Sequence, residues 1–212
     1  MNQADIKKIA QTLMASDASS HGWDHAERVW NLCRHIGRAE GADLEILRPA
    51  AYLHDIGRSE EKASGGEVCH ATAGAARARS ILKENGYDGE RVERIVHCIA
   101  SHRFRRNGEQ PGTLEARVLF DADKLDAIGA VGIGRAFLFA GEVGARLHNP
   151  EADILATQPY SSEDTAFREF SVKLQKVKGR MLTPTGKQIA EARHRFMVAY
   201  FDRLTQEVHG EK

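Results

Sequence analysis

Histidines and carboxylates stand on apolar faces at several separated places in the 212-residue sequence. His54 and Asp55 end the apolar stretch AAYLHD, His25 lies on a stripe of apolar residues with helical spacing, and His102 extends another such stripe by one turn. These faces should point into the protein, where a polar side chain needs a partner. Side chains of these types could bind a metal ion or transfer protons.

Further acids occur in the segment VLFDADKLDAIG, and His70 begins another helical pattern. Asp126 falls nearest the centre of its apolar face, while Asp121 and Asp123 fall on opposite shoulders. A single histidine on such a face is ordinarily a hydrogen-bonded core residue. Several acids and histidines on separate helices would instead be satisfied together by one divalent cation, which accepts imidazole and carboxylate ligands.

The ordered set of a histidine, a His-Asp pair and a later aspartate resembles a known family, the HD-domain metal-dependent phosphohydrolases. The segments GWDHAERVW, AAYLHDIGR and LEARVLFDADKLDAIGAVGIGRAF are similar to its motifs. The segments HATAGAARARSILKENGY, IASHRF and VKLQKVKGRMLTPTGKQIAEARHRFM resemble a bacterial subgroup of small HD hydrolases. The resemblance covers nearly the whole chain and implies an all-α fold.

The resemblance also implies a ligand set for a divalent metal ion such as Mn, Mg, Co, Ni or Fe. The ligands would be His25, His54, Asp55 and Asp123, the last because the motif A-D-x-L matches residues 122–125. Helical spacing alone leaves Asp121 open as the final ligand.

Three other residues take secondary parts in this interpretation. Asp126 would orient the imidazole of a metal ligand by contacting that ring, without binding the metal itself. His70 and His102 stand where some HD proteins hold a second metal, and contacts to a substrate phosphate are the alternative. The sequence favours one ion.

Phosphoryl chemistry needs cations near the developing negative charge. Arg58 and Lys124 are the predicted catalytic cations, and Arg28 is predicted in the second shell or in a salt bridge. Asp55 would bind the ion and accept a proton from the attacking water. Glu60 and Glu67 are weaker acid–base candidates. The segment SHRFRRNG, with Arg103, Arg105 and Arg106, is either a solvated helix end or a funnel for a phosphate.

The predicted function is therefore hydrolysis of a phosphate ester or anhydride in a small phosphorylated substrate, with a nucleotide as the favoured class. The alternatives are a non-catalytic sensor that binds metal and nucleotide, and a dinuclear-iron oxygenase, for which His70 and His102 would be ligands. Binding of nucleic acid is not expected, because the formal net charge is 0 and aromatic residues do not interleave the basic ones.

Helical periodicity runs through nearly the whole chain and must position these residues. The expected helices span 3–15, 24–40, 43–57, 70–85, 89–103, 113–128, 132–140, 163–179 and 184–208, with an irregular segment at 141–162. Pro49 could kink the third of them, and Thr183 should cap the last. The glycines of AIGAVGIGRAF should permit close helix packing or a break. The prediction is one all-α domain over 1–212, with an HD core at about 20–140 and a C-terminal extension at about 145–212 on the same core.

The three cysteines form no C-x-x-C motif, which favours a reducing compartment. No stretch approaches the roughly 20 apolar residues of a membrane span, and the first 20 residues lack the apolar centre of a signal peptide. The sequence thus predicts a cytoplasmic protein without a membrane partner and leaves a homodimer open.

Overall fold

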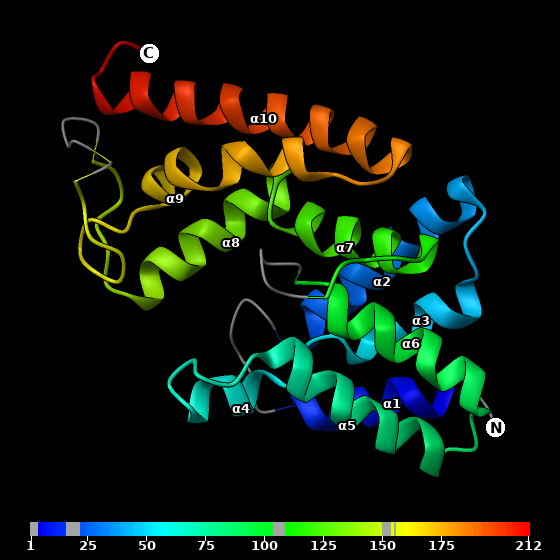
Figure 1. Cartoon of the computed structure of the whole chain (residues 1–212). Helices are drawn as coiled ribbons and strands as arrows, with labels where there is room; N and C mark the ends of the chain where they lie inside the picture. Colours follow the sequence, from blue (N-terminus) through cyan, green and yellow to red (C-terminus); the bar gives the residue numbers. More distant parts are fainter. Residues whose placement is uncertain (1–3, 16–21, 104–108, 150–153, 155) are drawn as a thin grey trace. The chain divides into compact units, whose positions relative to one another are not determined.

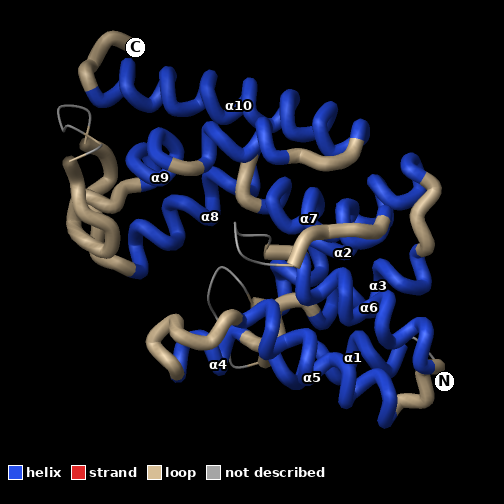
Figure 2. The backbone as a smooth tube through the Cα atoms, in the orientation of Figure 1, coloured by secondary structure: helices blue, strands red, loops and turns tan. Residues whose placement is uncertain are grey.

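The computed structural model describes residues 4–15, 22–103, 109–149, 154 and 156–212 (Figure 1). These residues form helices and loops without a strand (Figure 2), which confirms the all-α prediction. The helices are α1 Ala4–Met14, α2 Trp23–Glu40, α3 Leu44–Leu53, α4 Arg58–Ala63, α5 His70–Glu84, α6 Gly89–Ser101, α7 Leu114–Asp126, α8 Gly129–Glu142, α9 Ala166–Val172, the 3₁₀ helix η1 Leu174–Arg180 and α10 Pro184–Val208.

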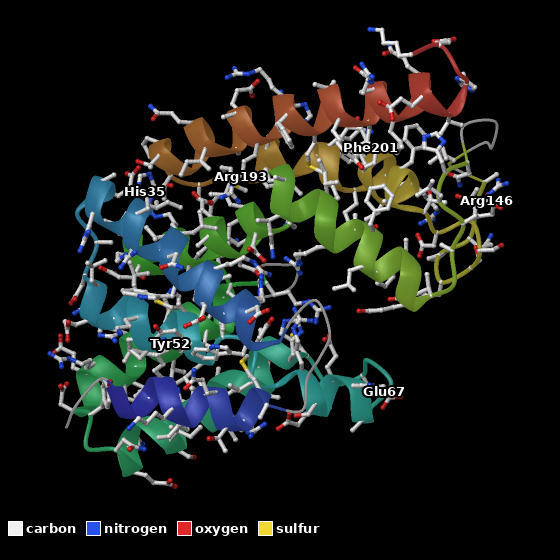
Figure 3. All side chains as sticks on the ribbon, turned by 180° about the vertical axis from the view of Figure 1, so that it is seen from behind. His35, Tyr52, Glu67, Arg146, Arg193 and Phe201 are labelled. Atoms are coloured by element: carbon white, nitrogen blue, oxygen red, sulfur yellow. The ribbon has the colours of Figure 1, made fainter. Side chains whose placement is uncertain are left out.

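The chain divides into two compact units, residues 1–123 and 124–212. Each is described by itself, and the single-domain organisation stays a prediction. In the first unit α3 packs against α2 and α6, and α5 packs against α6. Its core is built from the apolar faces of these helices, and includes Val29, Cys33, Ile36, Ile46, Leu47, Ala50, Ala78, Leu82, Ile95 and Ile99. Tyr52 lies in this unit and stacks on Trp23 with ring centroids 5.5 Å apart (Figure 3).

The second unit is organised around α10, which packs against α8 and η1. Phe201 on α10 stacks on Phe170 of α9 at a centroid distance of 4.5 Å (Figure 3). Thr183 caps α10 by accepting a hydrogen bond from the Gly186 backbone N–H at 3.0 Å, as predicted. The single helix expected at 163–179 is wrong, since α9 ends at Val172 and the chain continues as η1 after a non-helical Lys173.

The segment around His54 also differs from the expected helix at 43–57. Asp43 caps α3 as predicted, by accepting a hydrogen bond from the Glu45 N–H at 2.9 Å, and α3 runs through Pro49 without a break. The helix ends at Leu53, however, and a turn over 54–57 leads into the additional helix α4. The sequence RSEEKA of α4 buries no residue, so apolar periodicity could not indicate it.

Gly57 explains how α4 lies so close to α5. A Cβ at this position would stand 2.3 Å from the His70 carbonyl oxygen and 2.5 Å from the Gly74 backbone nitrogen. Both are backbone atoms, so only a residue without a side chain allows the contact. The start of α4 is thereby fixed against the first turn of α5. In the second unit a Cβ at Gly132 would stand 2.3 Å from the Ala127 carbonyl oxygen, which agrees with the close packing expected of these glycines.

The three cysteines are free: Cys33 and Cys98 are buried and Cys69 is exposed. None of the described helices combines the length and apolar character that crossing a bilayer requires. The cytoplasmic location and the homodimer stay predictions.

Replacing Gly57 should test the close approach of α4 and α5. We expect Gly57→Ala to lower the free energy of unfolding by about 1–3 kcal/mol, because the added methyl group would overlap backbone that cannot move aside cheaply. Gly89→Ala is the matched control, since a Cβ there meets no atom within 4 Å, and it should be neutral or slightly stabilising. Urea unfolding of both variants measures the difference, and equal stabilities would contradict the packing argument.

Candidate metal centre

Four histidines and two aspartates of the first unit converge on one buried cluster. His25 comes from α2, His54 and Asp55 follow α3, His70 begins α5, His102 follows α6, and Asp123 lies on α7. The four histidine residues are at most 4% exposed, Asp55 is 2% exposed, and the Asp123 side chain is 12% exposed. All six residues were predicted from the sequence as metal or substrate contacts, and the structure brings them together.

The first group in this cluster contains His25, His54, Asp55 and Asp123. The Nε2 atom of His25 lies 3.2 Å from His54 Nε2, 3.4 Å from Asp123 Oδ1 and 3.5 Å from Asp55 Oδ2. The Nε2 atom of His54 lies 3.5 Å from Asp55 Oδ2 and 3.9 Å from Asp123 Oδ1. The Nε2 atoms of His25 and His54 thus both lie within 4 Å of an oxygen of Asp55 and of Asp123, and His25, His54 and Asp123 form a group that could hold a metal ion.

The second group lies on the other side of the same carboxylate. The Nε2 atoms of His70 and His102 lie 3.3 Å apart. Asp55 Oδ1 stands 3.5 Å from His70 Nε2 and 3.6 Å from His102 Nε2. Asp55 therefore turns one oxygen toward each group of histidines.

Hydrogen bonds at the outer ring nitrogens determine which atoms point inward as acceptors. His54 Nδ1 lies 2.8 Å from the Ala51 carbonyl oxygen, and His102 Nδ1 lies 2.6 Å from that of Ile99. Because a carbonyl oxygen only accepts, each of these imidazoles must carry its proton on Nδ1. Both rings then turn Nε2 into the cluster, and in His54, whose pKa burial lowers, this atom presents a lone pair.

The donor set fits a divalent cation. Two ligand atoms about 2.1 Å from one ion lie about 3.0 Å apart at right angles and about 4.2 Å apart when opposite each other. The 3.2–3.9 Å separations in the first group fall in this range. The inward lone pair of His54 and the two nearby carboxylates would all attract a cation between them. Neutral imidazole with carboxylate is a common ligand set for borderline and hard divalent ions.

Burial keeps two of these histidines in the form that binds a cation. Burial lowers the pKa of His54 from its ordinary 6.5 to about 3, against the opposing effect of Asp55. Burial likewise lowers the pKa of His70 to about 4, again opposed by Asp55. Both rings are therefore neutral at pH 7, and a metal ion need not displace a proton from them.

Arg58 and Glu61 on α4 contact members of the cluster. Arg58 Nε donates a hydrogen bond of 2.6 Å to Asp55 Oδ2, and its side chain is 26% exposed. Glu61 accepts hydrogen bonds from His70 Nδ1 at 2.6 Å and from Arg103. Sequence reasoning identified Arg58 but missed Glu61. Helix α4, which carries Glu61, is too short and too polar to show an apolar pattern. The spacing of Glu61 from the His-Asp pair was the only signal in the sequence that could have indicated its place at the site.

The remaining predicted residues take different positions. Asp121 is fully buried and belongs to neither His/Asp group among the described residues, so the geometry favours Asp123 as predicted from the motif. Asp126 accepts a hydrogen bond of 2.8 Å from Arg135 in the second unit. Arg28 and Lys124 are half-buried. The roles predicted for Asp126, Arg28 and Lys124 stay predictions.

The weaker candidates have ordinary surroundings. Glu60 forms an ion pair with Arg77 at 2.9 Å. Glu67 is exposed in the loop between α4 and α5 (Figure 3). Arg103 forms an ion pair with Glu61, and the phosphate funnel stays a prediction. Arg105 and Arg106 lie outside the described residues.

Residues 22–128 match the model of the HD domain family. This region contains all six residues of the cluster, and the chain belongs to the HD domain family.

Relatives extend the similarity over the whole chain. The uncharacterised protein YpgQ of Bacillus subtilis is 33% identical over 214 residues, which cover 99% of this chain and 96% of YpgQ. The structure of Bacillus subtilis YpgQ in complex with ADP is similar over 100% of both chains, with a TM-score of 0.76 and 32% identity. An HD-superfamily hydrolase from Bacillus thuringiensis has a TM-score of 0.74 and 29% identity over 98% of this chain and 96% of its own.

The lowered histidine pKa values predict how stability depends on pH in the metal-free protein. Below pH 6.5 both histidines become protonated in the unfolded chain. In the folded chain His54 becomes protonated only at about pH 3 and His70 only at about pH 4. Stability is therefore full above pH 6.5 and falls as the pH drops, by roughly 1 kcal/mol per pH unit for each histidine. Urea unfolding in EDTA between pH 5 and 8 measures this slope, which His54→Gln should reduce. An unfolding free energy that is constant from pH 7 to 5 would contradict the assignment.

Proposed function

We propose that this chain is a metal-dependent phosphohydrolase that cleaves a phosphate ester or anhydride in a small phosphorylated substrate. The observation that carries the proposal is the convergence of four imidazole nitrogens and two carboxylates at one buried place. Membership of the HD family and the likeness to HD-superfamily hydrolases support the same reaction class. A structural polar cluster would not need so many acceptors facing each other.

In the proposed centre His25, His54, Asp55 and Asp123 hold the ion. A bound divalent ion supplies a nucleophile by lowering the pKa of its water, and it polarises a phosphate oxygen. In this proposal Asp55 would accept the proton of that water, and the contacts of its two oxygens with the histidines of the cluster support this role. Burial of the histidines excludes bulk water and strengthens these electrostatic interactions.

We further propose that His70, His102 and Asp55 Oδ1 hold a second cation rather than a phosphate oxygen. His102 turns Nε2 inward because its Nδ1 bonds a backbone carbonyl, and His70 does the same if Glu61 accepts the proton of its Nδ1. Two lone pairs 3.3 Å apart beside a carboxylate would repel a phosphate and attract a cation. The sequence favoured a single ion, and this proton arrangement favours two.

The favoured substrate class is a nucleotide. The structure of the relative YpgQ is a complex with ADP, which supports a nucleoside phosphate as the ligand of this chain. Arg58 is the proposed phosphate contact, because its guanidinium lies against Asp55 while its side chain stays 26% exposed. A guanidinium can bind two oxygens of one phosphate at once.

Neutralising Asp55 should abolish the activity. Protein loaded with Mn, Mg, Co or Ni is tested on nucleoside mono-, di- and triphosphates, a cyclic diester and a generic phosphate ester, with phosphate and pyrophosphate as products. We expect Asp55→Asn to lower kcat/KM by at least about 100-fold and to reduce bound metal, because the shared carboxylate is lost. Asp24→Asn is the matched control, an exposed aspartate beside His25, and should behave as wild type.

Equal metal content and turnover in Asp55→Asn and wild type would contradict the proposal. Tight binding of metal and nucleotide without product would favour a sensor instead. Two groups of histidines and carboxylates would also suit a dinuclear-iron oxygenase. Two irons per chain and turnover that depends on oxygen would favour that alternative. Phosphate or pyrophosphate release under anaerobic conditions excludes that alternative as the source of the activity.

A further inference from the structure

Glu61 lies beside the buried cluster of histidines and aspartates but belongs to neither of its two groups. It stands on the second turn of α4, and its side chain is 20% exposed. The close approach of Gly57 to the first turn of α5 places Glu61, four residues later, beside His70. This position is a consequence of backbone packing rather than of a flexible surface contact.

The two carboxylate oxygens of Glu61 have different partners. Oε2 accepts a hydrogen bond of 2.6 Å from His70 Nδ1. Oε1 accepts a hydrogen bond from Arg103 Nη1, and Arg103 directly follows His102 in the chain. Glu61 therefore contacts His70 directly, and it contacts the residue that follows His102 in the chain.

His70 could hold its proton on either ring nitrogen, and its surroundings decide between them. Arg103 Nη1 lies 3.2 Å from His70 Nδ1, and a bond from that donor would place the His70 proton on Nε2. The Glu61 carboxylate oxygen lies closer to His70 Nδ1, at 2.6 Å against 3.2 Å for Arg103 Nη1. An ionised carboxylate can only accept a hydrogen bond. The charged acceptor at the shorter distance places the proton on Nδ1.

We propose that Glu61 is a positioning residue that fixes His70 with its proton on Nδ1 and its Nε2 lone pair toward Asp55 and His102. Arg103 holds Glu61 in this orientation. The consequence for cation binding rests on the proposed metal centre, whereas the position of the proton does not. A carboxylate behind a metal-binding imidazole orients the ring and increases its basicity.

Glu60 provides a control for a purely structural role of such an acid. It is the preceding residue on the same helix, it forms an ion pair with Arg77, and it contacts no histidine of the cluster in the bonds described. Glu60→Gln and Glu61→Gln are the same chemical change one residue apart. Only Glu61→Gln leaves one acceptor oxygen for two donors, Arg103 and His70.

The direct test is nitrogen NMR of the full chain labelled with ¹⁵N-histidine, in EDTA at pH 7.5, with His70 assigned from His70→Gln. In wild type and Glu60→Gln we expect His70 to carry its proton on Nδ1. In Glu61→Gln the amide oxygen pairs with Arg103 and the NH₂ group faces His70, so the proton should move to Nε2. A wild-type His70 protonated on Nε2, or the same form in wild type and Glu61→Gln, would overturn the proposal. The wild-type spectrum decides the matter even if a variant fails to fold.

Mn²⁺ titration by calorimetry measures the consequence. Glu61→Gln should weaken binding at the second group about 10- to 100-fold, while Glu60→Gln should change it less than about twofold. Equal losses in both variants would show a structural role and overturn the positioning role. If wild type binds no Mn²⁺, the proposed metal centre fails, and the NMR result still decides whether Glu61 sets the proton of His70.

Discussion

One electrostatic constraint governs the first unit: two pairs of buried imidazoles bring their Nε2 atoms within hydrogen-bond distance of each other and close to the Asp55 carboxylate. His54 and His102 both bond a backbone carbonyl through Nδ1 and turn Nε2 inward, and the Nε2 atoms of His25 and His70 lie 3.2 and 3.3 Å away. A positive charge between these nitrogens and the Asp55 carboxylate would lower the electrostatic free energy of the buried cluster. In the proposed metal centre a bound cation would stabilise the cluster, and its binding free energy would add to that of folding.

His54, His70 and His102 each have a hydrogen-bond acceptor at the outer ring nitrogen, and the helices supply these acceptors in two ways. His54 and His102 use the same device, since each stands at the end of its helix and bonds the carbonyl oxygen three residues earlier. His70 starts its helix and therefore cannot use a preceding helical carbonyl, and Glu61 serves as the acceptor instead. The absence of a side chain at Gly57 is what allows α4 to bring that acceptor close.

Much of this could be predicted from sequence because apolar periodicity reveals buried faces, and polar residues on those faces then stand out. His25, His54 and His102 were found in this way, and the A-D-x-L motif separated Asp123 from Asp121. Helix α4 and Glu61 were not predicted, since a six-residue polar helix without a buried side chain has no periodicity. The end of α3 at Leu53 was missed for a related reason, because the turn is imposed by close backbone packing at Gly57 rather than by a local sequence pattern.

The central claim is that this cluster holds metal, and anomalous diffraction from crystals grown with Mn²⁺ tests it most directly. The account predicts one peak bounded by His25, His54, Asp55 Oδ2 and Asp123 Oδ1, and a second bounded by His70, His102 and Asp55 Oδ1. A single peak at the first position would contradict the second ion. Crystals grown with Mn²⁺ that show no peak within the cluster would contradict the metal centre itself.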